Sequence, residues 1–226
     1  MLDQIISLIP AMWLGCLAVL VLILRKGDIC PGQRGRIYKT FPILGIFALL
    51  VTWHSPSMIV SAVSIGYFFS RVKTGKTRQQ GPKWALDIAV VAALIAVVLD
   101  IISLPNATSA AGYLLCVPLL GAALAHAFLL IARSRLQAFH RILPFTGTVC
   151  ALGLVSFLMA CVYVWPQVLL SSHAEQAVVS FLLLIASVGV WCGHIFVNKA
   201  PQKWQLTLSL LMLIISAGST LSLLQL

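Results

Sequence analysis

Residues 84–104, WALDIAVVAALIAVVLDIISL, decide the fold of this chain. Apart from Asp87 and Asp100 the stretch carries no charge, and about 20 such residues are what a helix needs to cross a hydrocarbon core of roughly 30 Å. Three later stretches repeat the pattern, at residues 110–132, 142–165 and 205–226. The sequence therefore predicts several transmembrane helices.

The composition agrees with this prediction. Hydrophobic residues make up 61% of the chain and charged residues 9%, whereas charged residues account for about 25% of an ordinary soluble domain. This balance excludes a soluble enzyme, a nucleic-acid-binding module and a disordered or fibrous chain. The expected partners are membrane lipids, and no nucleic acid is expected despite the net charge of +10.

The basic residues predict the topology. All fifteen Lys and Arg fall in four loops, and loops that collect these residues face the cytoplasm. The loops hold Arg25, Lys26, Arg34, Arg36 and Lys39; Arg71, Lys73, Lys76, Arg78 and Lys83; Arg133, Arg135 and Arg141; Lys199 and Lys203.

Residues 41–70 could form one long helix or two short helices joined at residues 53–57. One helix would place ten of the positive charges inside and five outside, whereas a hairpin places all fifteen on one side. Pro56 also cannot continue a helix without the loss of a backbone hydrogen bond. We therefore expect an all-α, polytopic transmembrane bundle of about eight spans, with both termini outside.

The chain is expected to be a single integral membrane domain, residues 1–226, in a bacterial inner membrane. The first span is expected to be retained, because its basic residues follow the apolar run, whereas those of a signal peptide precede it. The predicted spans lie near residues 5–24, 40–54, 56–72, 84–104, 110–132, 142–165, 176–197 and 204–225.

Cysteine and histidine usage indicates no metal and no cofactor. The six cysteines are scattered and form no CxxC pair, which favours packing roles. Haem ligation needs facing histidines at matching depth, and the sequence suggests no such pairs. His54 and His173 fall in predicted outer loops and are expected to be solvated.

Ionisable residues inside spans are the best functional pointers, because each is costly in a bilayer without a partner or a hydrated cavity. Asp87, His126 and His194 fall near the inner end of their predicted spans and are the candidate catalytic residues. Asn198 follows His194 by one helical turn and is a candidate binding residue. Asp100, about 20 Å from Asp87 along its helix, is a second binding candidate near the outer headgroups. The alternative for each is a hydrogen-bonded packing residue or an interfacial charge.

Small residues indicate close helix packing. Gly189 and Gly193 form a small-xxx-small face of the kind that lets two helices approach in lipid. This face could serve packing within the bundle, or a homo-oligomer or membrane partner.

The chain resembles the YhhN family of lysoplasmalogenase-like proteins, compact eight-span bundles of similar length. The resemblance rests on short segments of similar sequence that are spread over most of the chain. It is carried by Tyr38-Lys39-Thr40-Phe41-Pro42-Ile43-Leu44, by residues 61–69 with Gly66, by residues 179–196, by the basic loop 198–203, and by Leu221-Ser222-Leu223. The family resemblance implies hydrolysis of the vinyl-ether bond of lysoplasmalogens.

Members of that family carry one acidic residue after a glycine at the end of the third span and another after a serine in the seventh. The chain departs from the family at both places. The corresponding segments here read Phe69-Ser70-Arg71-Val72 and Ala186-Ser187-Val188-Gly189. Neither has a carboxylate, so no catalytic residue is carried over. Two hypotheses follow: a diverged or inactive relative of these lipid hydrolases, or a small-solute carrier or accessory membrane subunit without catalysis. In the first, the substrate would be an ether-linked lysolipid, with Asp87 and His126 as acid and base.

Overall fold

The computed structural model describes residues 2–27, 29–72, 81–133, 138–197 and 200–226. Within these residues the chain forms helices and no strand. The helices are α1 (Leu2–Lys26), α2 (Pro31–Tyr38), α3 (Phe41–Val51), α4 (Met58–Arg71), α5 (Lys83–Ser103), α6 (Ala107–Ile131), α7 (Phe139–Val164), α8 (Gln167–Phe196) and α9 (Lys203–Leu224). The expectation of an all-α polytopic bundle is confirmed.

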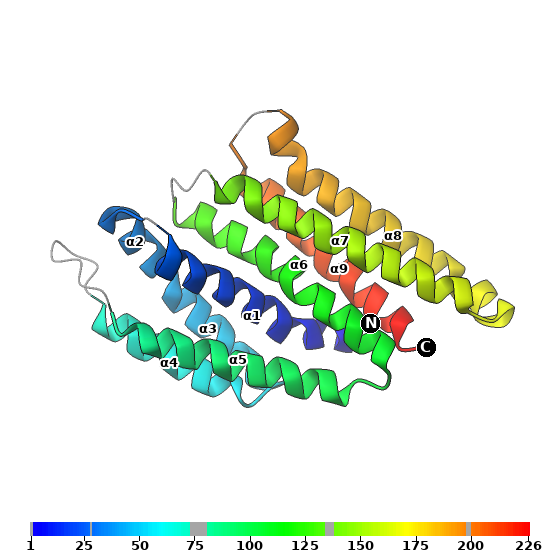
Figure 1. Cartoon of the computed structure of the whole chain (residues 1–226), viewed down its shortest axis with the longest axis horizontal. Helices are drawn as coiled ribbons and strands as arrows, with labels where there is room; N and C mark the ends of the chain where they lie inside the picture. The colour runs from blue at the N-terminus through cyan, green and yellow to red at the C-terminus, as the bar shows by residue number, and fades with distance from the viewer. Residues whose placement is uncertain (1, 28, 73–80, 134–137, 198–199) are drawn as a thin grey trace.

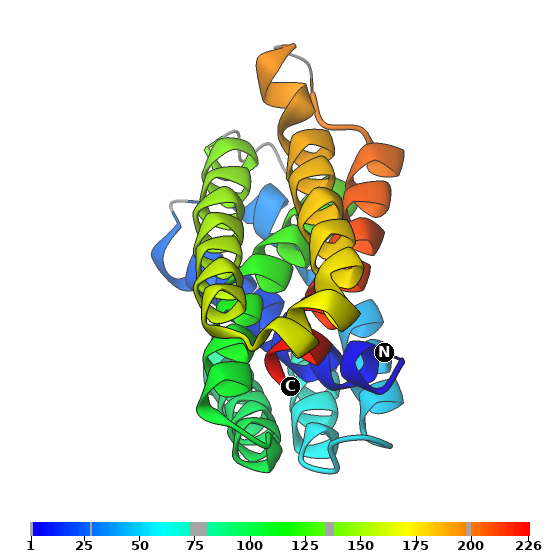
Figure 2. The ribbon, with the colours of Figure 1, turned by 90° about the vertical axis from the view of Figure 1, so that its right-hand side faces the viewer.

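The long helices run up and down along one axis, and both ends of the chain lie at the same end of the bundle (Figure 1). The central pair is α1 and α6, which pack against each other along their length. In the end view of Figure 2, α3, α4 and α5 lie on one side of this pair and α7, α8 and α9 on the other. The bundle therefore has two flanks, one on each side of the packed pair of α1 and α6.

In the described part of the chain, six helices are long and apolar enough to cross a membrane: α1, α5, α6, α7, α8 and α9. The segment at residues 41–70 is broken into two shorter helices, α3 with 11 residues and α4 with 14. Backbone N–H groups of His54 and Met58 bond to the carbonyls of Val51 and Ser55 and close the turn between them. This turn brings residues 54 and 55 to the outer end of α5.

Two helical segments differ from the sequence expectation. Residues 31–38 were expected in a basic loop and instead form α2, which buries Ile37 and Tyr38. The helix that ends at Phe196 begins at Gln167, nine residues before the predicted start, because Pro166 fits the turn that precedes a helix and nothing after it breaks one. His173 therefore lies on α8 and not in an outer loop.

The close packing of α1 against α6 depends on two glycines. A Cβ atom on Gly15 would lie 2.2 Å from the carbonyl oxygen of Val117, and one on Gly121 would lie 2.4 Å from the Cα of Gly15. Any side chain at either position would push α1 and α6 apart. By contrast, a Cβ on Gly189 would meet no atom within 4 Å, so that glycine faces outward and its predicted role toward a partner chain stays a prediction.

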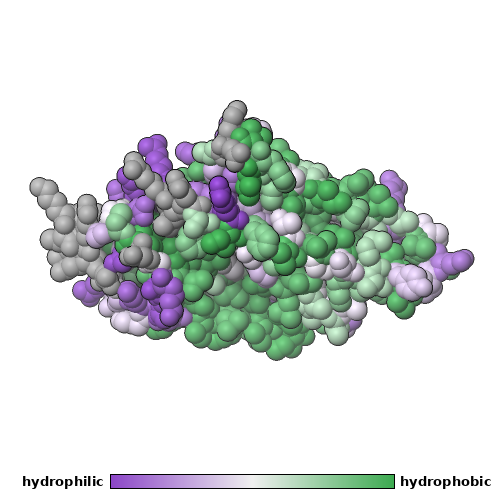
Figure 3. Space-filling view, turned by 45° about the horizontal axis from the view of Figure 1, so that its top comes forward, coloured by the Kyte–Doolittle hydropathy of each residue, from purple (hydrophilic) through white to green (hydrophobic). Residues whose placement is uncertain are grey.

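The surface matches a bilayer environment. Large apolar side chains are exposed on every long helix, among them Leu22, Ile102, Phe145 and Leu182. In Figure 3 hydrophobic residues cover the middle of the molecule, and hydrophilic residues gather at its two ends, most heavily at the end that carries α2. We call this the basic end, and the opposite end the outer end, following the predicted topology.

Candidate functional site

Among the described residues, two clusters of polar side chains that include histidine lie inside the bundle. The Asp100 cluster consists of Ser7, His54, Ser55, Asp100 and Tyr113, near the outer end. The histidine cluster consists of His126, His140, Trp191 and His194, toward the basic end. Tyr113 and His126 are both on α6, and the helical rise places them about 20 Å apart along its axis. The two clusters are therefore separate sites.

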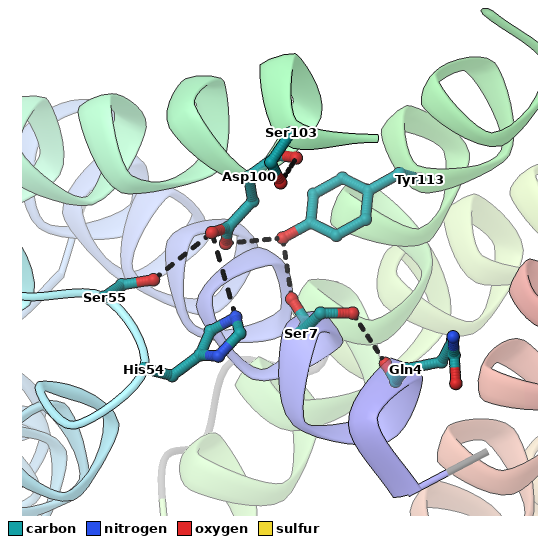
Figure 4. Close-up of polar contacts among 7 residues, drawn as sticks. All are labelled: Gln4, Ser7, His54, Ser55, Asp100, Ser103 and Tyr113. Carbon is teal, nitrogen blue, oxygen red and sulfur yellow. Dashed lines mark hydrogen bonds and ion pairs between the residues drawn. The ribbon is translucent and has the colours of Figure 1, made fainter. Parts of the chain in front are cut away.

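The Asp100 cluster joins three parts of the chain around one carboxylate (Figure 4). His54 Nε2 lies 3.8 Å from Asp100 Oδ1. Ser55 donates a hydrogen bond of 3.3 Å to the same oxygen, and Tyr113 lies 3.1 Å from Oδ2. The Asp100 side chain is 15% exposed and that of His54 34%. A carboxyl group and an imidazole are thus held side by side, partly shielded from solvent.

The phenol of Tyr113 has one proton and two acceptors within reach. One is the Ser7 carbonyl of α1 at 2.8 Å, the other Asp100 Oδ2. A carbonyl only accepts, so if the phenol donates to Ser7, its oxygen is free to accept a proton from the carboxyl group. The arrangement can therefore hold Asp100 in either protonation state, which is what a proton donor needs.

The Asp100 cluster lines a cavity of about 330 Å³. Its lining combines polar residues, among them Ser7, His54 and Asp100, with apolar residues such as Leu99 and Leu104 at the end of α5. A space lined by both kinds of side chain at the end of a membrane bundle suits an amphipathic ligand.

The histidine cluster is more deeply buried. The indole N–H of Trp191 donates to His126 Nδ1 at 2.9 Å, which leaves the proton of His126 on Nε2. That proton points to His140 Nδ1, also at 2.9 Å. His194 contacts the carbonyls of Trp191 and His140 at 2.8 and 3.2 Å. His126 and Trp191 have no exposed surface, so this cluster holds α6, α7 and α8 together.

The candidate site residues predicted from the sequence lie in different parts of the structure. His126 and His194 come together, with ring centroids 5.6 Å apart. Asp87 lies on α5 and forms an ion pair with Arg25 of α1, both side chains being more than two-fifths exposed. Because α5 packs against α1 and α4, whereas the histidines are on α6, α7 and α8, Asp87 belongs to the other flank. Asn198 lies outside the described residues.

Several site residues were missed or misjudged from the sequence. His54 is exposed, as expected, but its contact with Asp100 was not predicted. Tyr113, Ser55 and His140 were not considered. The pairing of consecutive antiparallel helices could have predicted one of these contacts. Two residues equally far from the turn between such helices tend to lie side by side. His126 and His140 each lie seven residues from Arg133, and their rings are in contact.

No group of three or more His, Cys, Asp or Glu side chains is arranged to hold a metal ion in the parts of the chain that the structure describes. The Asp100 cluster holds a carboxyl group, an imidazole and a phenol, all of which are side chains that can transfer protons.

Fold and site together define an integral membrane helix bundle with a polar cavity near one membrane face. The chain belongs to the family described as integral membrane domain, whose sequence model matches residues 3–225. An uncharacterized protein of Haemophilus influenzae is 28% identical over 207 residues, which cover 86% of this chain and 76% of the relative. No solved structure matches the chain.

Proposed function

We propose that the protein is a membrane-embedded hydrolase of an ether-linked lysolipid, with the Asp100 cluster as its acid–base site. The observation that carries the proposal is the contact between Asp100 and His54 at 3.8 Å beside a cavity with an apolar wall. A lysolipid has the matching shape, since its polar headgroup and its single chain need both kinds of wall. The resemblance to lysoplasmalogenase-like proteins supports the same substrate class.

Vinyl-ether cleavage needs a proton donor and a water molecule. The carboxyl group of Asp100 protonates the vinyl carbon that is not bonded to the ether oxygen, which leaves an oxocarbenium ion. Water adds to the carbon bonded to oxygen and gives up a proton to His54. The resulting hemiacetal collapses to an aldehyde and the free hydroxyl of the headgroup fragment. One water is consumed, and the proton returns from His54 to Asp100.

This proposal assigns the acid and base roles differently from the sequence hypothesis. Asp87 is paired with the guanidinium of Arg25, which makes it a poor proton donor. Both ring nitrogens of His126 are engaged by neighbours in the core. Asp100 and His54 have the required side-chain chemistry and also border a cavity.

The test is aldehyde release from a lysoplasmalogen by the protein purified in detergent micelles. We expect Asp100→Asn to lower the rate by about 100-fold or more, the usual contribution of general acid catalysis. Asp87→Asn is the matched control, because it makes the same change on the same helix outside the cavity, and it should keep the wild-type rate. Equal rates for Asp100→Asn and the wild type would overturn the assignment of the site.

The second candidate is a non-catalytic carrier or accessory subunit. The histidine cluster favours it, because buried ionisable side chains within a bundle often mark solute or proton paths. Wild-type protein that is folded but releases no aldehyde from any lysolipid would reject the hydrolase proposal in favour of this candidate.

A further inference from the structure

A second cavity, of about 550 Å³, lies at the basic end, where the junction of α2 and α3 meets the end of α6. Arg36, Lys39 and Arg133 line it together with Thr40, and the side chains of Ile43 and Ile131 continue its wall toward the lipid-facing surface. The cavity is remote from the Asp100 cluster, and nothing in the proposed reaction uses it.

The charges of this cavity are unbalanced. Its described lining contains three cationic side chains and no carboxylate. Within the described parts of the chain, the ion pairs are Arg25 with Asp87 and His54 with Asp100, so Arg36, Lys39 and Arg133 pair with no acid there. Three neighbouring cations repel one another unless an anion lies between them. The cavity therefore suits an anionic ligand.

The backbone holds two of these cations together. Arg36 Nη1 donates a hydrogen bond of 3.0 Å to the carbonyl oxygen of Arg133. Arg133 itself has a φ of 49°, the left-handed conformation that commonly follows the end of a helix and that glycine adopts most easily. An arginine at this position keeps a positive charge at the cavity where an uncharged glycine would fit the backbone better.

The apolar part of the cavity lining favours the headgroup of a lipid over a free anion as the ligand. Ile43 and Ile131 are each 50% exposed, on helices that present apolar side chains to the bilayer. A free phosphate ion would gain nothing from these side chains, whereas an acyl chain would cover them. Basic pockets on the cytoplasmic side of membrane helices commonly hold lipid headgroups.

We propose that this cavity binds an anionic phospholipid, with the phosphate between Arg36, Lys39 and Arg133 and one acyl chain against Ile43 and Ile131. The site is independent of the proposed hydrolase activity, and its ligand is a bound lipid and not a substrate.

The experiment measures thermal unfolding of the detergent-purified protein in titrations with dioleoylphosphatidylglycerol, dioleoylphosphatidylcholine or inorganic phosphate. Wild-type protein should be stabilised by the anionic lipid more than by the zwitterionic lipid or by phosphate. Lys39→Gln and Arg133→Gly should each weaken the apparent affinity by about five-fold, the effect of one basic residue near an anionic surface. Lys203→Gln, which removes one charge at the start of α9 outside the cavity, should leave the affinity unchanged.

Arg133→Gly keeps the proposal testable if other variants unfold. It removes the side chain, retains the carbonyl that Arg36 uses, and suits the left-handed backbone. Equal stabilisation by both lipids, wild-type affinity in Arg133→Gly, or equal protection by inorganic phosphate would each overturn the lipid site. None of these results depends on aldehyde release.

Discussion

The Asp100 cluster and the histidine cluster contain similar side chains but differ in burial and in the presence of a carboxylate. Each contains an imidazole and an aromatic hydrogen-bond donor, Tyr113 in one and Trp191 in the other. The Asp100 cluster adds a carboxylate and borders a cavity, whereas the histidine cluster has its indole and central imidazole fully buried. Under the proposed function, access and a proton donor, more than the presence of histidine, distinguish the Asp100 cluster from a packing contact.

The largest effect that would sharpen this comparison is expected from Trp191→Ala. The indole is fully buried and packs on Gly147, where a Cβ atom would lie 2.2 Å from the ring. Its removal leaves a cavity and should lower the free energy of unfolding by about 3–5 kcal/mol. Titration with a denaturing detergent measures this value. Aldehyde release per folded molecule should remain at the wild-type level, and a selective loss of release would place the active site at the wrong cluster.

A smaller loss of stability is expected from His126→Phe. The ring volume is retained, but the indole N–H of Trp191 loses its acceptor in the core. A buried donor without a partner costs about 1–3 kcal/mol, which the same detergent titration would detect. His173→Phe is the matched control, because His173 lies on α8 outside the cluster. If His126→Phe were as stable as this control, the histidine cluster would not stabilise the bundle.

The smallest stability effect is expected from Tyr113→Phe, which removes one hydroxyl from the Asp100 cluster. The free energy of unfolding should fall by about 1 kcal/mol, as for an ordinary hydrogen bond. Release of aldehyde should fall by about ten-fold, because Asp100 loses the group that orients Oδ2. An unchanged rate together with the expected loss of stability would remove Tyr113 from the site.

The fold was largely predictable because it follows from lengths and charges that the sequence displays. Helix α2 was not, since its eight residues are mostly polar and are stabilised by burial of Ile37 and Tyr38, a tertiary contact. Helix α8 is longer than the predicted span because polar residues such as Ser171, which are typical of loops, continue it. The Ser171 hydroxyl bonds back to the Val168 carbonyl within the helix.

The candidate site was predictable only in part. Asp100 could be singled out as a charge inside a span, but its partners come from the turn between α3 and α4 and from α6. Asp100 and Tyr113 lie almost equally far from the turn at Asn106, so their contact follows from antiparallel pairing. The contact with His54 requires in addition the lengths of α3 and α4, which no local pattern of residues encodes.

The shortness of the α3–α4 hairpin has a consequence for the surrounding membrane. At a rise of about 1.5 Å per residue, α4 with its 14 residues is about 21 Å long, well below the roughly 30 Å of a typical hydrocarbon core. The long helices of the opposite flank have 22 to 30 residues. A hydrophobic mismatch is therefore expected where this hairpin meets the lipid, and local thinning of the bilayer would accommodate it. Such thinning would bring the headgroup layer closer to the carboxylate of Asp100.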